Sequence, residues 1–385
     1  MKTITQNTPC PELILEEPLA PKRSRLQEFW RLFRKNRLAV MGLIFFIVFF
    51  LTALVGLILT SGTRPVLDPS LVRLQEKLLP PLSRPNLDSL QTNEIPALEI
   101  YLFGTDDLGR DVFARMLQGA WVSLTVGFVA VGISVLIGIF MGGVAGYFGQ
   151  HHLRVNHLLL LGAVVTAAVL LVAGHVFSGG LLAGSCLAYA AHLLLRTKPA
   201  TRPAILHHKV LSVDTLVMRF VDIMLCFPSF FLILTVVALL PASIYNIMIV
   251  IGLTSWMGAT RFVRAEFLSL RELDFVAAAR ALGLGNFRII FRHMMPNAIA
   301  PVLVSATIGI ATAILTEAGL SFLGFGVPPP HATWGNILSD GKRFIFDAPW
   351  LTFIPGLAIL VVVLSFNLFG EGLRDVMNPK LRERQ

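Results

Sequence analysis

The chain has 385 residues, of which 55% are hydrophobic and only 14% are charged, and its formal net charge is +9. This composition excludes an ordinary soluble domain. The positive charge does not indicate a nucleic-acid-binding protein, because the basic residues gather in alternate connections between apolar segments, as the positive-inside rule expects. Anionic lipid headgroups, rather than nucleic acid, account for the charge.

Apolar runs long enough to cross a bilayer recur along the chain. We predict membrane spans at residues 38–60, 119–147, 155–176, 178–195, 214–240, 244–262, 297–319 and 350–370. Basic clusters precede the first span, lie in the connections 196–209 and 261–292, and close the chain. The sequence therefore predicts an all-α polytopic membrane protein of about eight spans. Both termini, residues 1–37 and 373–385, are expected to be cytoplasmic tails.

The connection 61–118 is expected on the external side and is rich in proline, so we predict extended and turning backbone there. It ends in a polar motif at residues 103–112. The residues of interest in this motif are Gly104, Asp106, Asp107, Gly109, Arg110 and Asp111. We expect the first two aspartates to accept backbone hydrogen bonds, and Arg110 to pair with Asp107 or Asp111. These residues favour a cap beneath the next helix, in which the polar groups bind one another, over a ligand site.

The span 119–147 carries three glycines at four-residue spacing, namely Gly138, Gly142 and Gly146. This spacing places them on one helix face and predicts close approach of another helix. Residues 151–212 are interpreted as an inserted helical hairpin, which leaves the orientation of everything downstream unchanged.

The span 214–240 contains Pro228, which removes a helical hydrogen bond and is expected to kink the span. A kinked helix suits a moving pathway, although static membrane helices also contain proline. Near the start of this span, Arg219 and Asp222 are three residues apart and can pair across one helical turn.

Residues 263–296 join two spans on the basic side and contain a short polar helix that starts at Asp274. Alanines favour the helix, Gly283 can stop it in the left-handed conformation, and Pro296 suits the first turn of the following span. The other residues singled out here are Ala277, Ala278, Ala279, Arg280 and Arg288. Small side chains let a helix sit deeply in a groove, whereas a helix lying on lipid needs bulkier apolar residues. We therefore predict a docking element for a soluble partner.

This loop resembles that of the inner-membrane permease subunits of binding-protein-dependent ABC importers, and most of all the second, oligopeptide permease C-like permease of the dipeptide, oligopeptide and nickel group. In that family the loop carries a Glu-Ala-Ala…Gly pattern and forms the coupling helix that docks on the ATPase subunit. The matching positions are Ala278, Ala279, Gly283 and Pro296. The family's glutamate position is Ala277 here, so packing or Arg280 must replace its contact.

The motif at 103–112 and the segments 29–42, 317–335 and 349–375 carry the same resemblance. The resemblance implies a type I ABC importer permease fold with an extra N-terminal span. The permease domain would cover residues 119–372. The usual six-span pattern of the family does not explain the insertion 151–212.

The resemblance implies four kinds of partner: a second permease in a heterodimer, two ATPase subunits that bind ATP and Mg, an external substrate-binding protein, and membrane lipid. No cofactor is expected in this chain, because the nearest approach to a Walker A motif, from Gly335 to Arg343, has the wrong spacing. No cluster of catalytic type supports a membrane enzyme, and the cysteine spacing suggests no metal site.

Glu317 is the main acidic residue within a span. It either faces the pathway or anchors residues 318–330 by accepting backbone N–H bonds, since membrane charges are usually paired. Pro228 and Asn367 are the other candidates for a pathway or structural role. Short peptides are the expected cargo and nickel is the alternative, while a passive channel is a third hypothesis, which would need no ATPase.

Overall fold

The computed structural model describes residues 25–62, 65–87, 90, 95–149, 152–154, 184–185 and 209–377. Within these residues the regular secondary structure is almost entirely helical, and the connection before α3 is mostly irregular backbone. The exception is an antiparallel pair of short strands, β1 (His152–Arg154) and β2 (Lys209–Ser212). The spans predicted at 155–176 and 178–195 lie outside the described residues, so the inserted hairpin stays a prediction.

The helices follow the order in which the apolar runs occur. They are α1 (Arg25–Lys35), α2 (Arg37–Thr60), η1 (Leu74–Glu76), α3 (Val112–Phe148), α6 (Val213–Leu225), α7 (Ser229–Leu239), α8 (Ile244–Arg271), α9 (Asp274–Ala281), α10 (Asn286–Arg288), η3 (Ile289–Met294), α11 (Met295–Phe322), α12 (Trp334–Gly341), η4 (Lys342–Phe344) and α13 (Trp350–Met377). Five of the described helices are long and apolar enough to cross a membrane, and the bent pair α6 and α7 makes a sixth if it is one span. The all-α polytopic prediction is confirmed.

Three helices, α3, α8 and α13, extend well beyond the predicted spans. α3 starts at Val112 rather than residue 119, because the side chain of Asp111 accepts from the N–H of Phe113 and caps the helix there. α8 continues to Arg271 and α13 to Met377. A hydropathy pattern marks only the part of a helix that lies in the hydrocarbon, whereas the backbone hydrogen bonding continues into water.

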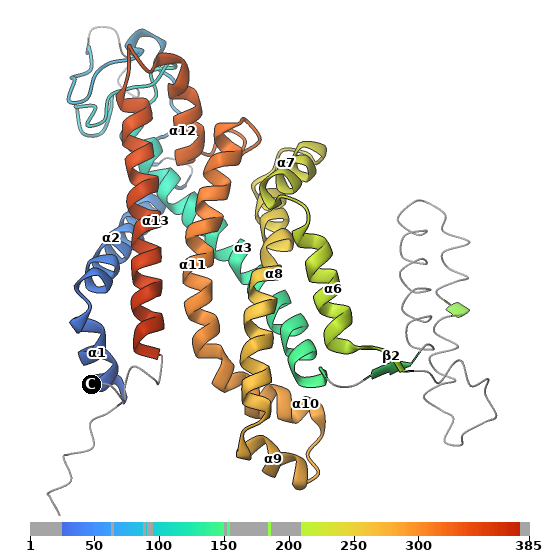
Figure 1. Ribbon diagram of the computed structural model, residues 1–385. Coiled ribbons are helices and arrows are strands. Elements are labelled where there is room, and N and C mark those ends of the chain that lie inside the picture. The colour runs from blue at the N-terminus through green and yellow to red at the C-terminus, as the bar shows by residue number, and fades with distance from the viewer. Residues whose placement is uncertain are drawn as a thin grey trace, which may run out of the picture.

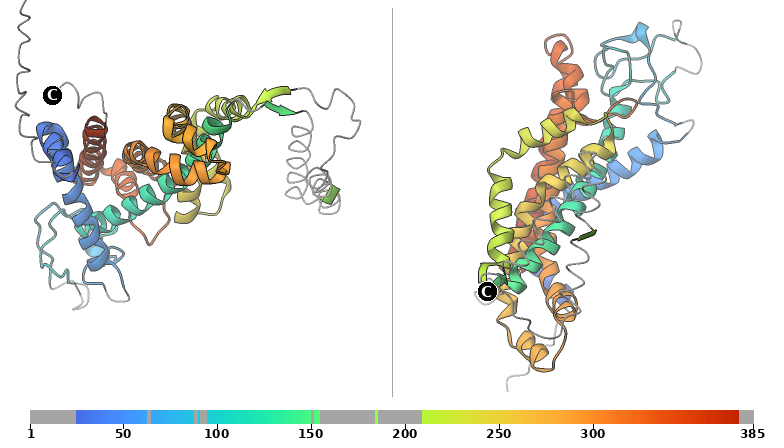
Figure 2. Two further views of the ribbon diagram at one scale, coloured as in Figure 1. Left: turned by 90° about the horizontal axis from the view of Figure 1, so that it is seen from below. Right: turned by 90° about the vertical axis from the view of Figure 1, so that its right-hand side faces the viewer.

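The helices form an elongated bundle (Figures 1 and 2). α3 crosses its centre and packs most extensively against α8, while α13 packs against both α2 and α11. α12 and the external connection lie at one end of the bundle. α9 and α10 lie at the other end, where α1 begins and α13 ends (Figure 1).

The three glycines of α3 do lie against another helix. A Cβ at Gly142 would come within 2.5 Å of the Thr260 oxygen, and one at Gly138 within 2.5 Å of the Ala259 Cβ. At Gly146 the near atom is the Cβ of Phe267, again at 2.5 Å. α3 and α8 therefore meet backbone to backbone, and even a methyl group would push them apart.

The span predicted at 214–240 is broken rather than kinked. α6 and α7 meet at an angle of 77°, and Pro228 is the residue that caps α7. The expected pair within α6 is loose, at 4.0 Å between Arg219 and Asp222. Asp222 instead forms an ion pair of 2.6 Å with Arg261 of α8, because the neighbouring helix places a guanidinium closer than the next turn does.

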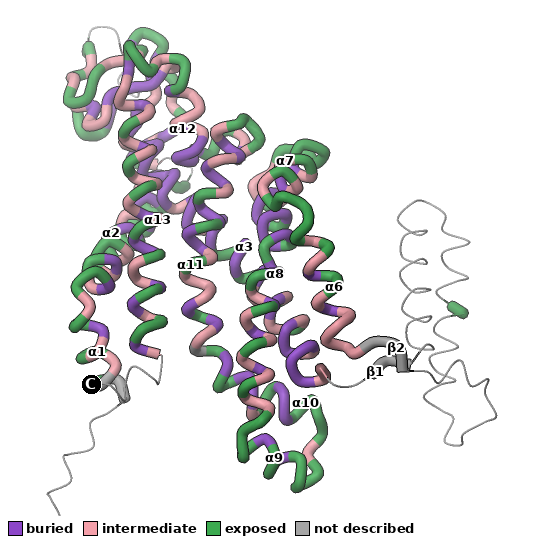
Figure 3. Tube along the Cα trace, in the orientation of Figure 1, coloured by how far each residue is buried: buried purple, intermediate pink, exposed green. Residues whose placement is uncertain are grey.

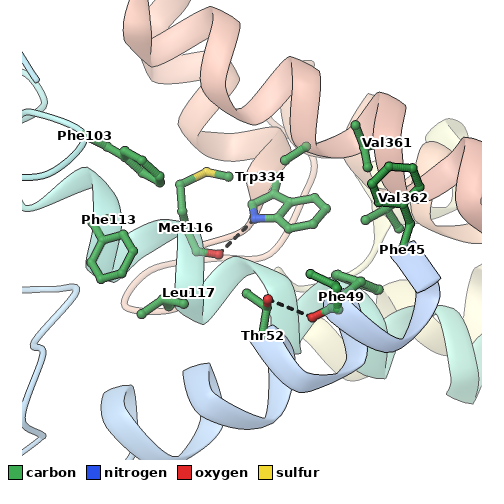
Figure 4. Close-up of a pocket in the computed structure, with 12 residues that line it drawn as sticks. Phe45, Phe49, Thr52, Phe103, Phe113, Met116, Leu117, Trp334, Val361 and Val362 are labelled. Atoms are coloured by element: carbon green, nitrogen blue, oxygen red, sulfur yellow. Dashed lines mark hydrogen bonds between the residues drawn. The ribbon is translucent and has the colours of Figure 1, made fainter. Parts of the chain in front are cut away.

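The first span is held to the bundle by aromatic packing. Phe49 of α2 lies 5.4 Å from the ring of Trp334, whose Nε1 donates to the Met116 oxygen at 2.9 Å. Beside this ring lies an apolar cavity of about 260 Å³ between α2, α3 and α13 (Figure 4). α2 is therefore packed against the rest of the bundle and is not merely joined to it by the connection.

The α3–α8 contact yields the first prediction. Gly142→Leu is expected to lower the free energy of unfolding in detergent by about 1–3 kcal/mol, because the side chain overpacks a backbone contact. Thermal unfolding of the purified protein measures this. Gly132→Leu is the matched control in the same helix, since a Cβ there meets nothing within 4 Å. Equal effects of the two substitutions would contradict the assigned contact.

Candidate functional site

The loop between α8 and α11 projects from one end of the bundle. α8 has 28 residues, so it is about 42 Å long at 1.5 Å per residue, against a hydrocarbon core of about 30 Å. It therefore extends out of the bilayer and carries α9, α10 and η3 with it (Figure 1). The short polar helix predicted from Asp274 is present as α9.

α9 carries a charge of the favourable sign at each end and is capped at its C-terminus. Asp274 lies in its first turn and Arg280 in its last, so both charges complement the helix dipole. Gly283 has φ of +73°, and its N–H donates to the Arg280 oxygen at 2.9 Å while the N–H of Leu284 donates to the Ala279 oxygen at 3.2 Å. These two bonds make a Schellman motif, which confirms Gly283 as the left-handed stop.

α9 has two distinct faces. Val276 and Ala279 are buried in a cluster with Phe267, Ile289 and Met294. Ala277 and Ala278 are exposed, and with Asp274 they follow the i, i+3, i+4 spacing of one helix face (Figure 3). Three of the predicted docking residues therefore share a solvent-facing stripe. Ala279 is an exception, because it belongs to the packing that supports the helix.

Tyr147, at the end of α3, ties the loop to the bundle on both sides of Gly283. The guanidinium of Arg280 lies over its ring at 5.3 Å, and its hydroxyl donates to Oδ1 of Asn286 at 2.8 Å. Tyr147 is the last residue of the span predicted at 119–147, and nothing in its sequence context indicated a contact with the loop. This contact gives α9 and α10 a direct connection to α3.

The predicted place of Pro296 is confirmed in the first turn of α11. The turn before it, η3, is a π-helix, and the N–H of Met295 donates to the Ile290 oxygen five residues earlier. Such segments are frequent at functional sites. Pro296 has no N–H to offer, so the wider turn forms where an α-helical hydrogen bond is already missing. Arg288, in α10, is exposed.

The external motif forms a buried ionic network at the opposite end of the bundle. Asp106 is fully buried and accepts from the backbone N–H groups of Leu108 and Arg110, each at 2.9 Å. Its other oxygen pairs with Arg110 at 2.7 Å and with Arg115 at 2.5 Å. Both guanidiniums also reach Asp340 of α12. The motif therefore joins the external connection to α3 and α12.

Of the two ion pairs expected for Arg110, the one with Asp107 is present but long, and the one with Asp111 does not form. Asp107 is 4.0 Å from its guanidinium, and Asp111 caps α3 instead. Arg110 reaches Asp106 because the turn between them has Gly109 at φ of +71°, which folds the chain back on itself. Gly104 is also left-handed, with φ of +75°. Asp107 does not accept the expected backbone bond, and burial, followed by the Asp106 and Asp340 carboxylates, raises its pKa.

Glu317 is fully buried in α11 and is bound by hydroxyl groups. It accepts from Ser321 at 2.6 Å and from Ser123 of α3 at 3.3 Å. Hydroxyl groups therefore take the place of the backbone N–H groups expected as its partners. Asn367 is exposed on α13 and Pro228 lies at the α6–α7 break, so these two candidates belong to separate elements. In the described part of the chain, no three His, Cys, Asp or Glu residues are grouped to hold a metal ion.

The fold and this loop define a class: a polytopic helical membrane protein with a structured helix held outside the bilayer. Residues 204–383 match the model of the binding-protein-dependent transport system inner membrane component, and residues 24–81 match that of the N-terminal transmembrane domain of oligopeptide transport permease C. The chain is 35% identical to the dipeptide transport system permease protein DppC of Alkalihalophilus pseudofirmus, covering 92% of this chain and 90% of that one. The chain therefore belongs to the family of inner-membrane permeases of binding-protein-dependent transport systems.

Other relatives are similar over nearly their whole length. The dipeptide permease DppC of Haemophilus influenzae is 34% identical, covering 94% of this chain and 97% of that one. The oligopeptide permease OppC of Bacillus subtilis is 31% identical, covering 91% of this chain and 88% of that one. A solved structure of the MetNI methionine ABC transporter, facing inward, aligns with a TM-score of 0.42 and 16% identity, covering 68% of this chain and 96% of that one.

The ionic network yields a second prediction. Arg115→Met is expected to lower the free energy of unfolding by about 3 kcal/mol, because a fully buried carboxylate loses one of its two guanidinium partners. Denaturation of the purified protein measures this, with Arg84→Met as the control at an exposed arginine of the same connection. Adding Asp106→Asn should restore part of the loss, and no restoration would argue against a charge effect.

Proposed function

We propose that this chain is the permease subunit of an ATP-driven importer that carries short peptides across the inner membrane. Family membership supports the transport role, and the names of the dipeptide and oligopeptide relatives support the cargo. The observation that carries the coupling assignment is α9, a capped helix beyond the bilayer with a stripe of small residues facing solvent. The names of these relatives give no such support to nickel.

The partners of this subunit would be two soluble ATPase subunits, a second permease and an external substrate-binding protein. ATP and Mg would be bound by the ATPase subunits, and this chain would hold no cofactor. The end of the bundle that carries α9 would face the cytoplasm. The starts of α1 and α2 and the end of α13 lie at this same end, which agrees with cytoplasmic termini (Figure 1).

Force on α9 would pass into the bundle through two rigid connections. α8 precedes it with only Glu272 and Leu273 between the helices, and Tyr147 links the loop to α3. α3 and α8 are themselves joined by the glycine contacts, so a displacement of α9 would move both helices as one body. Closure of the ATPase subunits would then rock these helices between inward-facing and outward-facing states.

The cargo is tested by reconstituting the complete complex with its binding protein in liposomes. We expect ATP-dependent uptake of di- and oligopeptides that exceeds uptake of nickel. Nickel uptake without peptide uptake would overturn the cargo assignment. Uptake by the permeases in the absence of the ATPase subunits would favour a passive channel.

The coupling role is tested at Gly283. Gly283→Val is expected to abolish most ATP-driven uptake while membrane insertion stays normal, because a β-branched residue at φ of +73° distorts the end of α9. Gly285→Val is the matched control two residues away, since Gly285 has φ of −66°, which valine adopts readily. Normal uptake by Gly283→Val would refute the coupling assignment.

A further inference from the structure

Large apolar side chains project into solvent just beyond α9. Leu282 is 80% exposed and Phe287 is 75% exposed, and the two lie on either side of the turn at Gly283–Gly285. Phe291 is 43% exposed, and its ring lies 4.4 Å from that of Phe287. Apolar side chains so exposed outside the hydrocarbon are unfavourable in water and indicate a surface that another molecule covers.

Three exposed arginines accompany these side chains. Within the described residues, no carboxylate lies within 4.0 Å of the guanidiniums of Arg280, Arg288 or Arg292. The arginines of α8 differ, because Arg261 and Arg264 are paired with aspartates of α6. The loop therefore presents positive charge that the rest of the described chain does not neutralise.

A bilayer surface would also attract aromatic and basic residues, but the geometry favours a protein. α8 holds the loop beyond the hydrocarbon, where apolar side chains could not reach the acyl chains without bending the helix back. Just before these groups in the chain, the exposed stripe of α9 consists of alanines and the acidic Asp274. Alanines bury little area in lipid, so this stripe gives a membrane little to bind.

We propose that the surface formed by Leu282, Phe287, Arg280, Arg288 and Arg292 docks in a groove of the soluble ATPase subunit that has an apolar floor and carboxylates along its rim. Leu282 and Phe287 fill the floor, and the arginines meet the carboxylates by charge complementarity. The alanine stripe allows α9 to approach closely enough for both contacts to form. This inference rests on the proposed function and adds the chemistry of the partner surface.

The apolar contact is tested by measuring how tightly the purified ATPase subunit binds the permease pair in nanodiscs without nucleotide. Leu282→Ser and Phe287→Ser should each weaken binding roughly tenfold, because each removes a large apolar side chain that docking would bury. Phe346→Ser is the control, as Phe346 is 97% exposed and lies outside the loop, in the connection between η4 and α13. Unchanged affinity in both test variants would overturn the apolar floor.

The charge contact is tested with Arg288→Glu and Arg292→Glu, and Arg343→Glu near α12 is the matched control. At low salt the two test variants should bind the ATPase subunit roughly tenfold more weakly than the control, and the difference should shrink as salt is raised. Equal affinity at all salt concentrations would overturn the acidic rim. A second result would also overturn it: variants that bind the ATPase subunit normally but whose transport no longer depends on anionic lipid. The arginines would then contact the membrane.

These outcomes separate the inference from the function on which it rests. If Gly283→Val loses uptake while the Leu282, Phe287 and arginine variants bind normally, the coupling role stands and the proposed groove is wrong. If the unmodified permease pair does not bind an ATPase subunit and transports without one, the proposed function fails.

Discussion

The contact between α3 and α8 is the constraint on which the rest of the structure depends. Gly138, Gly142 and Gly146 let the two backbones meet, and no larger residue fits between them. In a membrane, where lipid is as apolar as the side chains, such close packing is a main source of helix association. It also makes one rigid unit of the helix that carries α9 and the helix that carries Tyr147.

The two ends of this unit use different chemistry. At the external end, Asp106 is buried among two guanidiniums and backbone N–H groups, so the connection is fixed to α3 and α12 by charge. At the other end, the loop is supported by a small apolar cluster and Tyr147, while its arginines and apolar side chains face outward. The first end satisfies its charges internally, whereas at the second the guanidiniums of Arg288 and Arg292 form no ion pair among the described residues.

Local patterns predicted local features well. The stop at Gly283 and the position of Pro296 follow from backbone geometry that few other residues supply, so these two positions were predicted individually. The glycine spacing predicted a close helix contact but not its partner, α8. Ion pairs were predicted less well: the expected Arg110–Asp107 and Arg219–Asp222 pairs are long, at 4.0 Å each. The shorter partners are Asp106 for Arg110 and Arg261 of another helix for Asp222.

The sequence by itself determined the class of the protein, most of the spans that the structure describes and the short helix from Asp274, because hydrophobic length, charge bias, and glycine and proline geometry act over a few residues. Only the tertiary structure decided which face of α9 is free. Ala277 and Ala278 face solvent while Ala279 packs inward, and these three alanines are indistinguishable in sequence. Tyr147 reaches the loop from a distant part of the chain, and such contacts depend on how helices pack, which no local pattern encodes.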